Sequence, residues 1–252
     1  KKIKPDLVYN LAADADVRNS FDDPINNTHN NVNSCINLLQ SIKETNKNCI
    51  FIQCSTSEVY GIVQKKNLPI KENQKFNPVN PYAVTKSYQD FMSQVFAKSF
   101  NLKIIITRMF TYNNARRVNL FQTAFAKQIV EIEKKKLKSG ILYHGNLKSK
   151  RCHLDIVDAM EAYWLTATRG RIGEIYNISG TKILSVERYL ETLLKLTNIK
   201  IKKKLDKNLI RPIDIPLQVP SSTKFRKHTG WKEKIKFNDS VLKLFNECRM
   251  RY

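Results

Sequence analysis

Short apolar segments that alternate with segments of helical periodicity constrain the fold of this chain more than any other feature. Three of the apolar segments are continuous rather than alternating, which is typical of strands buried on both faces of a sheet. They are LVYNL (residues 7–11), IFIQC (50–54) and LKIIIT (102–107). Parallel strands need long crossover connections, and a helical pattern stands between these strands. The pattern predicts an α/β fold with a parallel sheet covered by helices on both faces.

The remaining elements follow from the same periodicities. Apolar residues recur at helical spacing in several segments, and further apolar runs indicate strands. We expect helices at residues 31–42, 82–100, 120–136, 156–167 and 186–196, and further strands at 140–144 and 173–179. The last of these strands resembles one more member of the main sheet. The part of the chain after it is punctuated by proline and predicts a smaller, less regular region.

Composition limits the classes of protein that fit this pattern. With 252 residues, 42% of them hydrophobic, the chain can bury a sizeable core. No apolar run approaches the ~20 residues that a membrane-spanning helix needs, so we expect no membrane partner. The five cysteines are scattered without metal-ligand spacing. We therefore expect reduced, mostly buried thiols, no metal site and a cytoplasmic protein.

The formal net charge of +22 raises the question of a nucleic-acid partner. The lysines are dispersed along the chain beside many asparagines and isoleucines, and arginine is the scarcer cation. Basic residues do not alternate with aromatic residues in a pattern that would stack bases. We therefore expect an ordinary solvated surface and no nucleic-acid partner, although the charge should favour anionic ligands.

Hydroxyl and carboxylate side chains end the strand expected at residues 50–54. The stretch is STSEVYG, in which Thr56 and Glu58 are two residues apart. Ligands of parallel sheets gather beyond the carboxyl ends of the strands, so this is a place for a functional site. Taken alone, the stretch could also be a simple capped turn.

A second motif, NPVNPYAVTK, opens the helix expected at residues 82–100. Pro81 suits the first turn of a helix, and Tyr82 and Lys86 then lie four residues apart on one face. An ammonium near a phenol lowers the phenol pKa from about 10 towards neutral, where tyrosine can act as acid or base. A threonine hydroxyl near the phenol can hold a substrate alcohol. Many helices carry this spacing with the lysine in solvent, so the motif gains weight only together with STSEVYG.

In combination, these motifs resemble the extended short-chain dehydrogenase/reductase family, and within it the nucleotide-sugar 4,6-dehydratases. The chain is most similar to the GDP-mannose 4,6-dehydratases and their sister GDP-4-keto-6-deoxymannose reductases. The resemblance also includes LAADADV, NVNSCINLL, NNARRVN followed by FAKQI, HGNLKSKR, GEIYNISG and IRPIDIPLQVPSSTKFRKHTGW, and so covers nearly the whole chain.

The resemblance implies a Rossmann-type, doubly wound parallel sheet with a smaller C-terminal substrate-binding region. On this basis we expect the NAD(P)-binding domain at residues 1–110 and 154–179. The nucleotide-sugar-binding region is expected at residues 111–153 and 180–252. A homo-oligomer, either a dimer or a tetramer, is also what the family leads us to expect.

The resemblance further implies a lyase that converts GDP-mannose into GDP-4-keto-6-deoxymannose. Tyr82 would take the proton of the sugar 4-hydroxyl while hydride leaves C4 for NADP or NAD. Lys86 would tune the tyrosine and bind the nicotinamide ribose, and Thr56 would hydrogen-bond the 4-oxygen. Glu58 would then remove the C5 proton, after which water leaves C6 and hydride returns to C6.

Other positions match residues that bind cofactor or substrate in the family. Leu11, Ala12 and Ala13 would line the cofactor together with Lys86. The remaining matches are Tyr112 and Arg117 for the cofactor, and Arg151 and Arg211 for the nucleotide diphosphate. An arginine suits both tasks, because its guanidinium forms two parallel hydrogen bonds with a phosphate.

The chain also departs from the family pattern. The glycine-rich phosphate loop and the first two or three strands of the family are missing from the sequence, so we expect an N-terminally incomplete sheet with residues 7–11 at an open edge. Residues 1–252 alone should then bind a dinucleotide weakly or not at all. Tyr112 stands where the family has His, Cys152 replaces an Asp, and Ser34 stands where Gly is usual.

Two alternatives to the dehydratase stay open at this point. The segment NNARRVN differs from the dehydratase pattern, which favours the sister reductase or another epimerase or reductase of the family. The missing glycine-rich loop favours a non-catalytic fragment or binding subunit.

Overall fold

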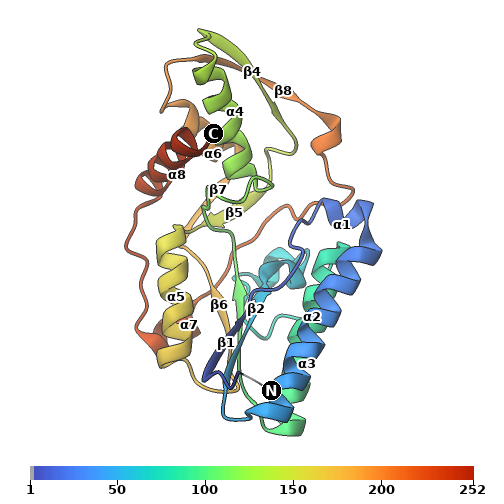
Figure 1. Cartoon of the computed structure of the whole chain (residues 1–252). Helices are drawn as coiled ribbons and strands as arrows, with labels where there is room; N and C mark the ends of the chain where they lie inside the picture. Colours follow the sequence, from blue (N-terminus) through green and yellow to red (C-terminus); the bar gives the residue numbers. More distant parts are fainter. Residues whose placement is uncertain (1–2) are drawn as a thin grey trace. The chain divides into compact units, whose positions relative to one another are not determined.

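The computed structural model describes residues 3–252, which form two compact units, each built from segments that are separate in sequence (Figure 1). Unit 1 consists of Lys1–Phe110, Met160–Ile178 and Pro220–Lys232, and unit 2 consists of Thr111–Ala159, Ser179–Val219 and Glu233–Tyr252. Pro220–Lys232 thus packs with the first unit although it lies late in the chain.

Unit 1 is built on a parallel sheet that has, within residues 3–252, four strands in the order β1–β2–β3–β6. The strands are β1 (Leu7–Asn10), β2 (Ile50–Thr56), β3 (Lys103–Met109) and β6 (Ile175–Ile178). β2 and β3 are buried along almost their whole length, as their continuous apolar sequences predict. The predicted α/β fold with a parallel sheet is confirmed, and β1 lies at one edge of the sheet.

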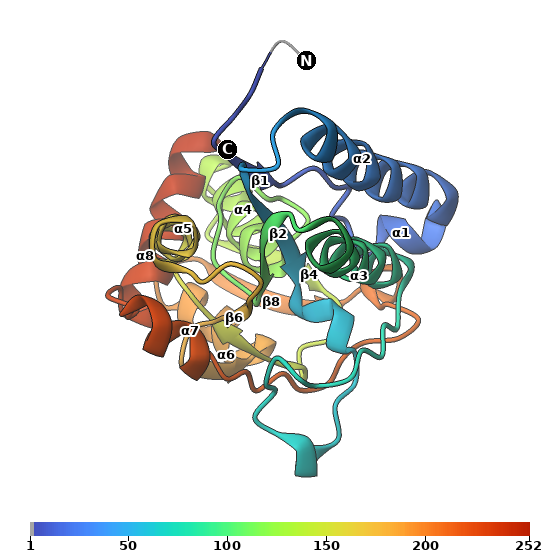
Figure 2. The same cartoon turned by 90° about the horizontal axis from the view of Figure 1, so that it is seen from below.

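Helices cover both faces of this sheet (Figures 1 and 2). α2 (Pro24–Thr45) and α3 (Pro81–Phe100) lie on one face, with the short α1 (Asn19–Asp22) beside them. α7 (Thr223–Thr229) and the unit 1 part of α5 (Ile156–Arg169) lie on the other. Leu39 of α2 and Phe96 of α3 pack with Phe51 and Ile104 of the strands in one buried cluster.

α2 begins earlier than the apolar pattern predicts. The expected helix covers residues 31–42, whereas α2 starts at Pro24 with Asp23 as its N-cap, whose side chain accepts a hydrogen bond from the Asn26 backbone. The first two turns are polar apart from Pro24 and an exposed Ile25, and they present no apolar stripe, so periodicity alone misses them. Their start is instead marked by an Asp-Pro pair, which is a capping signal.

Unit 2 packs helices against two small sheets. The helices are α4 (Phe121–Lys134), α6 (Val186–Leu194) and α8 (Phe237–Arg251). One sheet pairs β4 (Ser139–His144) with β8 (Lys200–Leu205) in parallel, and the other pairs β5 (Lys150–His153) with β7 (Lys182–Ser185) antiparallel. The core between them is a buried cluster that includes Phe125, Ile129, Leu142, Leu190 and Phe245.

Several of these elements carry no clear signal in the sequence. β5 and β7 have four residues each, which is too few to establish a period. β8 reads KIKKKL and is exposed along most of its length, so it lacks the apolar pattern of a buried strand. α8 does carry an amphipathic pattern, with Val241, Leu244, Phe245 and Cys248 buried, and the sequence reading overlooked it.

Three further observations bear on function. All five cysteines are free and buried, as predicted. Among residues 3–252, the structure brings no three His, Cys, Asp or Glu side chains together in a way that could hold a metal ion. No helix in the same part of the chain has both the length and the apolar character needed to cross a membrane.

Candidate active site

The STSEVYG stretch leaves the sheet at the carboxyl end of β2 and forms a short 3-10 helix, η1 (Ser57–Tyr60). The Thr56 hydroxyl caps η1 by accepting a hydrogen bond from the backbone N–H of Glu58 at 3.3 Å. η1 ends at Gly61, which has φ 55° and whose Cβ would lie 1.7 Å from the backbone oxygen of Asn77. Only glycine fits there. The cap uses one lone pair of Thr56, so its O–H can still donate to a ligand.

Tyr60 fixes the other end of this stretch inside unit 1. Its hydroxyl donates to Oδ1 of Asn177 at 2.7 Å and accepts from the guanidinium of Arg108 at 2.9 Å. Arg108 in turn forms a buried ion pair with Asp90 of α3 at 2.9 Å. The loop that carries Thr56 and Glu58 is therefore anchored at both ends, so its functional groups have a defined position.

Asn80 links this loop to the start of α3. Its side-chain oxygen accepts from the backbone N–H of Ala83 at 2.7 Å, which caps the helix, and its amide nitrogen donates to Oε2 of Glu58 at 3.1 Å. One side chain thus fixes the Glu58 carboxylate relative to the helical turn that carries Tyr82. Glu58 is half-buried and keeps free lone pairs, so it can accept a proton. The sequence reading missed Asn80, although Asn before Pro at a helix start is an N-cap signal.

α3 buries both members of the Tyr-x-x-x-Lys motif, with Tyr82 8% and Lys86 3% exposed. The Lys86 ammonium donates to the backbone oxygen of Cys54 at 2.6 Å and to Oε1 of Gln89 at 2.5 Å. Burial lowers the pKa of Lys86 to about 8. The alternative that this lysine extends into solvent is therefore wrong.

A buried amide network holds the partners of Lys86 in place. The side chain of Gln89 donates to the backbone oxygen of Asn31 at 2.6 Å, and its oxygen accepts from Gln53 at 2.9 Å. Two bonds leave the Lys86 ammonium one N–H in the described part of the chain. That N–H can serve Tyr82 or a ligand, and the predicted effect of Lys86 on the Tyr82 phenol stays a prediction.

Leu11, Ala12 and Ala13 follow the carboxyl end of β1, whose last residue, Asn10, pairs with Gln53 of β2. The side-chain oxygen of Asn10 accepts from the backbone N–H of Ala12 at 3.2 Å and holds this turn. Leu11 is 66% exposed, which is unusual for a large apolar residue at the end of a buried strand. The structure thus brings these residues to the same edge of the sheet as Thr56.

The predicted diphosphate-binding arginines lie in unit 2. Arg151 of β5 is 7% exposed, and its guanidinium donates to Oδ1 of Asp214 at 3.1 Å. Asp214 belongs to the same RPIDIP segment as Arg211, so this ion pair ties the two arginine segments together. Arg151 is not the exposed surface cation that its neighbour Lys150 suggests. Arg211 is half-buried.

Tyr112 and Arg117 also belong to unit 2 and lie in the polar loop before α4. Both are half-buried. The backbone N–H of Arg117 donates to the backbone oxygen of Asn114 at 3.1 Å, which closes a turn. Their predicted contacts with the cofactor stay predictions.

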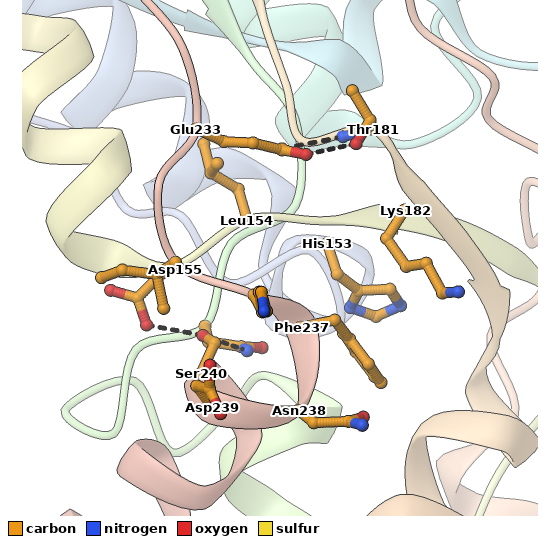
Figure 3. A pocket seen from close by; sticks show the side chains of 13 residues that line it. His153, Leu154, Asp155, Thr181, Lys182, Glu233, Phe237, Asn238, Asp239 and Ser240 are labelled. Atoms are coloured by element: carbon orange, nitrogen blue, oxygen red, sulfur yellow. Dashed lines mark hydrogen bonds between the residues drawn. The ribbon is translucent and has the colours of Figure 1, made fainter.

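Unit 2 also contains a cavity of about 370 Å³ that none of the predicted site residues lines (Figure 3). Two of its acidic side chains are already paired: Asp155 accepts from Ser240, and Glu233 accepts from Thr181. His153 differs, because it is buried and neither ring nitrogen has a hydrogen-bond partner. Its ring stacks on Tyr189 with centroids 5.0 Å apart, and burial lowers its pKa to about 3. No sequence pattern predicts this neutral, buried histidine.

Known proteins resemble the chain in sequence over nearly its whole length. Residues 1–244 match the family model described as GDP-mannose 4,6 dehydratase. GDP-6-deoxy-D-mannose reductase of Pseudomonas aeruginosa is 26% identical over 247 residues, which are 98% of this chain and 81% of the relative. GDP-mannose 4,6 dehydratase of Dictyostelium discoideum is 28% identical over an alignment of 264 positions, gaps included, which covers 95% of this chain and 72% of the relative.

Solved structures resemble the chain in fold. The structure of RMD from Pseudomonas aeruginosa complexed with NADPH has a TM-score of 0.90 and 25% identity, covering 98% of this chain and 82% of that one. DesIV, a dTDP-glucose 4,6-dehydratase from Streptomyces venezuelae with NAD and TYD bound, has a TM-score of 0.86 and 21% identity, covering 97% and 73%. These similarities confirm the Rossmann-like sheet with its covering helices.

Proposed function

The chain belongs to the GDP-mannose 4,6-dehydratase family of nucleotide-sugar dehydratases and reductases, and from this premise we propose that it is an NAD(P)-dependent nucleotide-sugar 4,6-dehydratase acting on GDP-mannose. One observation carries the proposal. At the carboxyl edge of the unit 1 sheet, the Thr56 hydroxyl and the Glu58 carboxylate are tied through Asn80 to the helix of Tyr82 and Lys86. A dehydratase needs a carboxylate base beside groups that handle an alcohol, because elimination requires removal of a carbon-bound proton.

Each side chain has a distinct task in this proposal. Tyr82 takes the proton from the sugar 4-hydroxyl, and Thr56 donates a hydrogen bond to the 4-oxygen. The ketone formed at C4 acidifies the C5 proton, which Glu58 removes. Burial lowers the pKa of Lys86 to about 8, so at pH 7 it is still mostly charged and can favour the tyrosinate.

The residues at this edge fit the nicotinamide half of a dinucleotide. Lys86 has an N–H left over for a ribose hydroxyl, and Leu11 presents an uncovered apolar side chain on the same edge of the sheet. NADP or NAD, when bound, would supply the hydride acceptor at C4 and the donor at C6. Because the sequence contains no glycine-rich phosphate loop, we predict that residues 1–252 alone bind NADP or NAD weakly or not at all. Calorimetric titration measures this, and micromolar binding at one site would contradict it.

Unit 2 would hold the nucleotide-sugar, with Arg151 and Arg211 on the diphosphate. The guanidinium of Arg151 is already oriented by Asp214 at 3.1 Å. It therefore loses little further side-chain freedom when a phosphate binds its remaining N–H groups. Tyr112 and Arg117 would contact the cofactor, with Arg117 directed to the 2′-phosphate of NADP.

A homo-oligomer is part of the proposal, and the surface of α3 supports it. Val84, Phe91 and Val95 are 54%, 53% and 49% exposed. They recur at helical spacing and so form one apolar stripe on α3. Stripes of this kind mark protein interfaces more often than isolated apolar residues do.

The proposal is tested with the full-length protein, GDP-mannose and NADP. Mass spectrometry should show a product lighter than GDP-mannose by one water, with no net reduction of NADP. Unchanged GDP-mannose, in protein that binds both compounds by calorimetry, would refute the dehydratase assignment.

The second candidate is the sister reductase. It is favoured by the similarity to GDP-6-deoxy-D-mannose reductase, which extends over 98% of this chain. A reductase consumes one NADPH for each 4-keto sugar, whereas a dehydratase returns its hydride. Stoichiometric loss of NADPH absorbance with GDP-4-keto-6-deoxymannose would therefore select the reductase.

A further inference from the structure

Two lysine-rich segments that are far apart in sequence meet on one small sheet of unit 2. The first, KKKLK at residues 134–138, ends α4 and leads into β4, and the second, KIKKKL, is β8 itself. β4 and β8 pair in parallel and lie side by side in Figure 1. The backbone N–H of Lys200 donates to the backbone oxygen of Lys138 at 3.0 Å, so the two segments touch. The pairing places the end of the first segment beside the start of the second.

The inner face of the β4–β8 sheet belongs to the core of unit 2. Leu142 is fully buried there, and a Cβ on Gly140 would collide with the side chain of Ile132 in α4. Lys203 pairs with Glu187 of α6 at 3.0 Å. This face is therefore in contact with α4 and α6 along much of its length.

The outer face combines cations with uncovered apolar groups. Partners in register share a face, so Ile141 lies beside Lys202 and Tyr143 beside Lys204. The Lys204 ammonium lies 5.7 Å from the centre of the Tyr143 ring, which agrees with this pairing. Ile141 and Tyr143 are 45% and 42% exposed. We call the face formed by Ile141, Tyr143, Lys200, Lys202 and Lys204 the lysine ribbon.

No carboxylate neutralises the lysine ribbon in the part of the chain that the structure describes. The nearby acids are engaged elsewhere: Glu133 with Arg249, Glu187 with Lys203, and Asp206 with the backbone N–H of Asn208. Alternate residues of a strand are ~6.6 Å apart, so the three ribbon lysines form a row ~13 Å long. Such a row of unpaired charges produces a local positive potential that a matching anionic surface would relieve.

We propose that the lysine ribbon docks this protein onto an anionic membrane surface. Lysines near such a surface are attracted to acidic headgroups, and each strengthens binding by about fivefold. Ile141 and Tyr143 would enter the interfacial layer, where aromatic and aliphatic side chains gain from leaving water. A hollow of about 490 Å³ lined by residues 139–141 and 200–202 offers room for one lipid headgroup. The expectation of no membrane partner rested on the absence of a spanning segment and does not bear on surface docking.

The composition of the ribbon favours a membrane over a nucleic acid. Neither lysine-rich segment contains arginine, the residue whose planar fork recognises phosphate groups in nucleic acids. Tyr143 is the single aromatic residue among the ribbon residues, whereas single-strand binders stack successive bases on several aromatic side chains. The exposed, apolar side chain of Ile141 would form no polar contact with a sugar-phosphate backbone.

The test is flotation of the protein with vesicles at low and physiological salt. It should bind vesicles of equal parts phosphatidylcholine and phosphatidylserine and should not bind vesicles of phosphatidylcholine alone. The variant Lys200→Gln/Lys202→Gln/Lys204→Gln should lower the partition coefficient by about 100-fold, since three lysines are neutralised. The control variant Lys65→Gln/Lys66→Gln/Lys71→Gln removes the same charge from exposed positions of unit 1 and should change it less than twofold.

Two further measurements separate the membrane from other anions. Ile141→Ser/Tyr143→Ser should weaken vesicle binding several-fold, and circular dichroism should show that the fold is kept. If the ribbon variant and the control variant lowered the partition coefficient equally, binding would depend only on net charge, and the proposal would be overturned. Tighter binding to a single-stranded oligothymidine than to the acidic vesicles would also overturn it, in favour of nucleic acid.

Discussion

The two units hold their candidate functional groups in different ways. In unit 1, Glu58 and Lys86 are fixed by neutral partners, namely the Asn80 amide, the Gln89 amide and the Cys54 carbonyl. In unit 2, Arg151 is fixed by the opposite charge of Asp214. Both kinds of contact stabilise the charged form, but a neutral partner adds no opposite charge and an ion pair does. This difference is consistent with the proposal of proton transfer in unit 1 and of anion binding in unit 2.

Tyr82→Phe should produce the largest effect, because it removes the proposed proton acceptor and keeps the ring. We expect turnover to fall by about 10³-fold or more, with little change in stability, since only the hydroxyl is lost. Steady-state kinetics and thermal unfolding of the full-length protein would measure both. If stability and activity were lost together, Tyr82 would be a structural core residue. The proposed difference between proton transfer in unit 1 and anion binding in unit 2 would then lose its support.

Glu58→Gln should rank second and separates two steps that Tyr82→Phe blocks together. The amide keeps the size of the carboxylate and cannot take the C5 proton, so elimination should slow by about 10²-fold or more. Oxidation at C4 should still occur, and reduced cofactor should accumulate on the protein as absorbance of bound NADPH. Release of dehydrated sugar at the parent rate would show that Glu58 is only part of a turn.

The sequence predicted unit 1 better than unit 2, and the reason is physical. β2 and β3 are buried on both faces, so burial selects continuous apolar runs that are visible in the sequence. β8 is exposed along most of its length, so its lysines face solvent and packing does not require apolar residues there. Such a strand forms because it pairs with β4, which lies more than fifty residues earlier in the chain. A local sequence pattern cannot predict this pairing.

The same difference applies to the site. Thr56, Glu58, Tyr82 and Lys86 could be named because their motifs place chemistry at the end of a strand and the start of a helix. The residues that hold them could not all be named this way. Gln89 contacts Lys86 from three residues further along α3, but Gln53 of β2 contacts Gln89 only after the helix has packed on the sheet.

The third prediction concerns His153 of unit 2, a buried titratable group whose ring nitrogens have no hydrogen-bond partner. Its expected effect is on stability and is smaller than the two effects on turnover. Its pKa is about 3 in the folded chain, against about 6.5 when unfolded. The unfolded state therefore binds more protons between these values, and stability falls as the pH drops below about 6.5. From pH 7 to pH 5 the free energy of unfolding should decrease by about 2 kcal/mol through this residue.

His153→Phe should remove that part of the pH dependence, since the ring already packs among Phe121, Tyr189 and Phe237. Urea unfolding of both proteins at pH 7 and pH 5 gives the difference directly. A parent and variant with the same pH slope would mean that a proton is accommodated in the folded state.

Asn80→Ala should have the smallest effect and tests whether positioning in unit 1 is separate from stability. The substitution removes both the N-cap of α3 and the bond to Glu58. The loss of the cap alone should lower the free energy of unfolding by about 1 kcal/mol.

Asp23→Ala is the matched control, because Asp23 caps α2 with the same kind of bond to the backbone N–H of Asn26 and has no contact with Glu58. Both variants should lose similar stability in denaturant unfolding, but only Asn80→Ala should lower the turnover number, by about fivefold, because an unheld carboxylate meets the C5 proton less often. Equal turnover in the two variants would show that η1 alone positions Glu58 and that the neutral contact of Asn80 is structural.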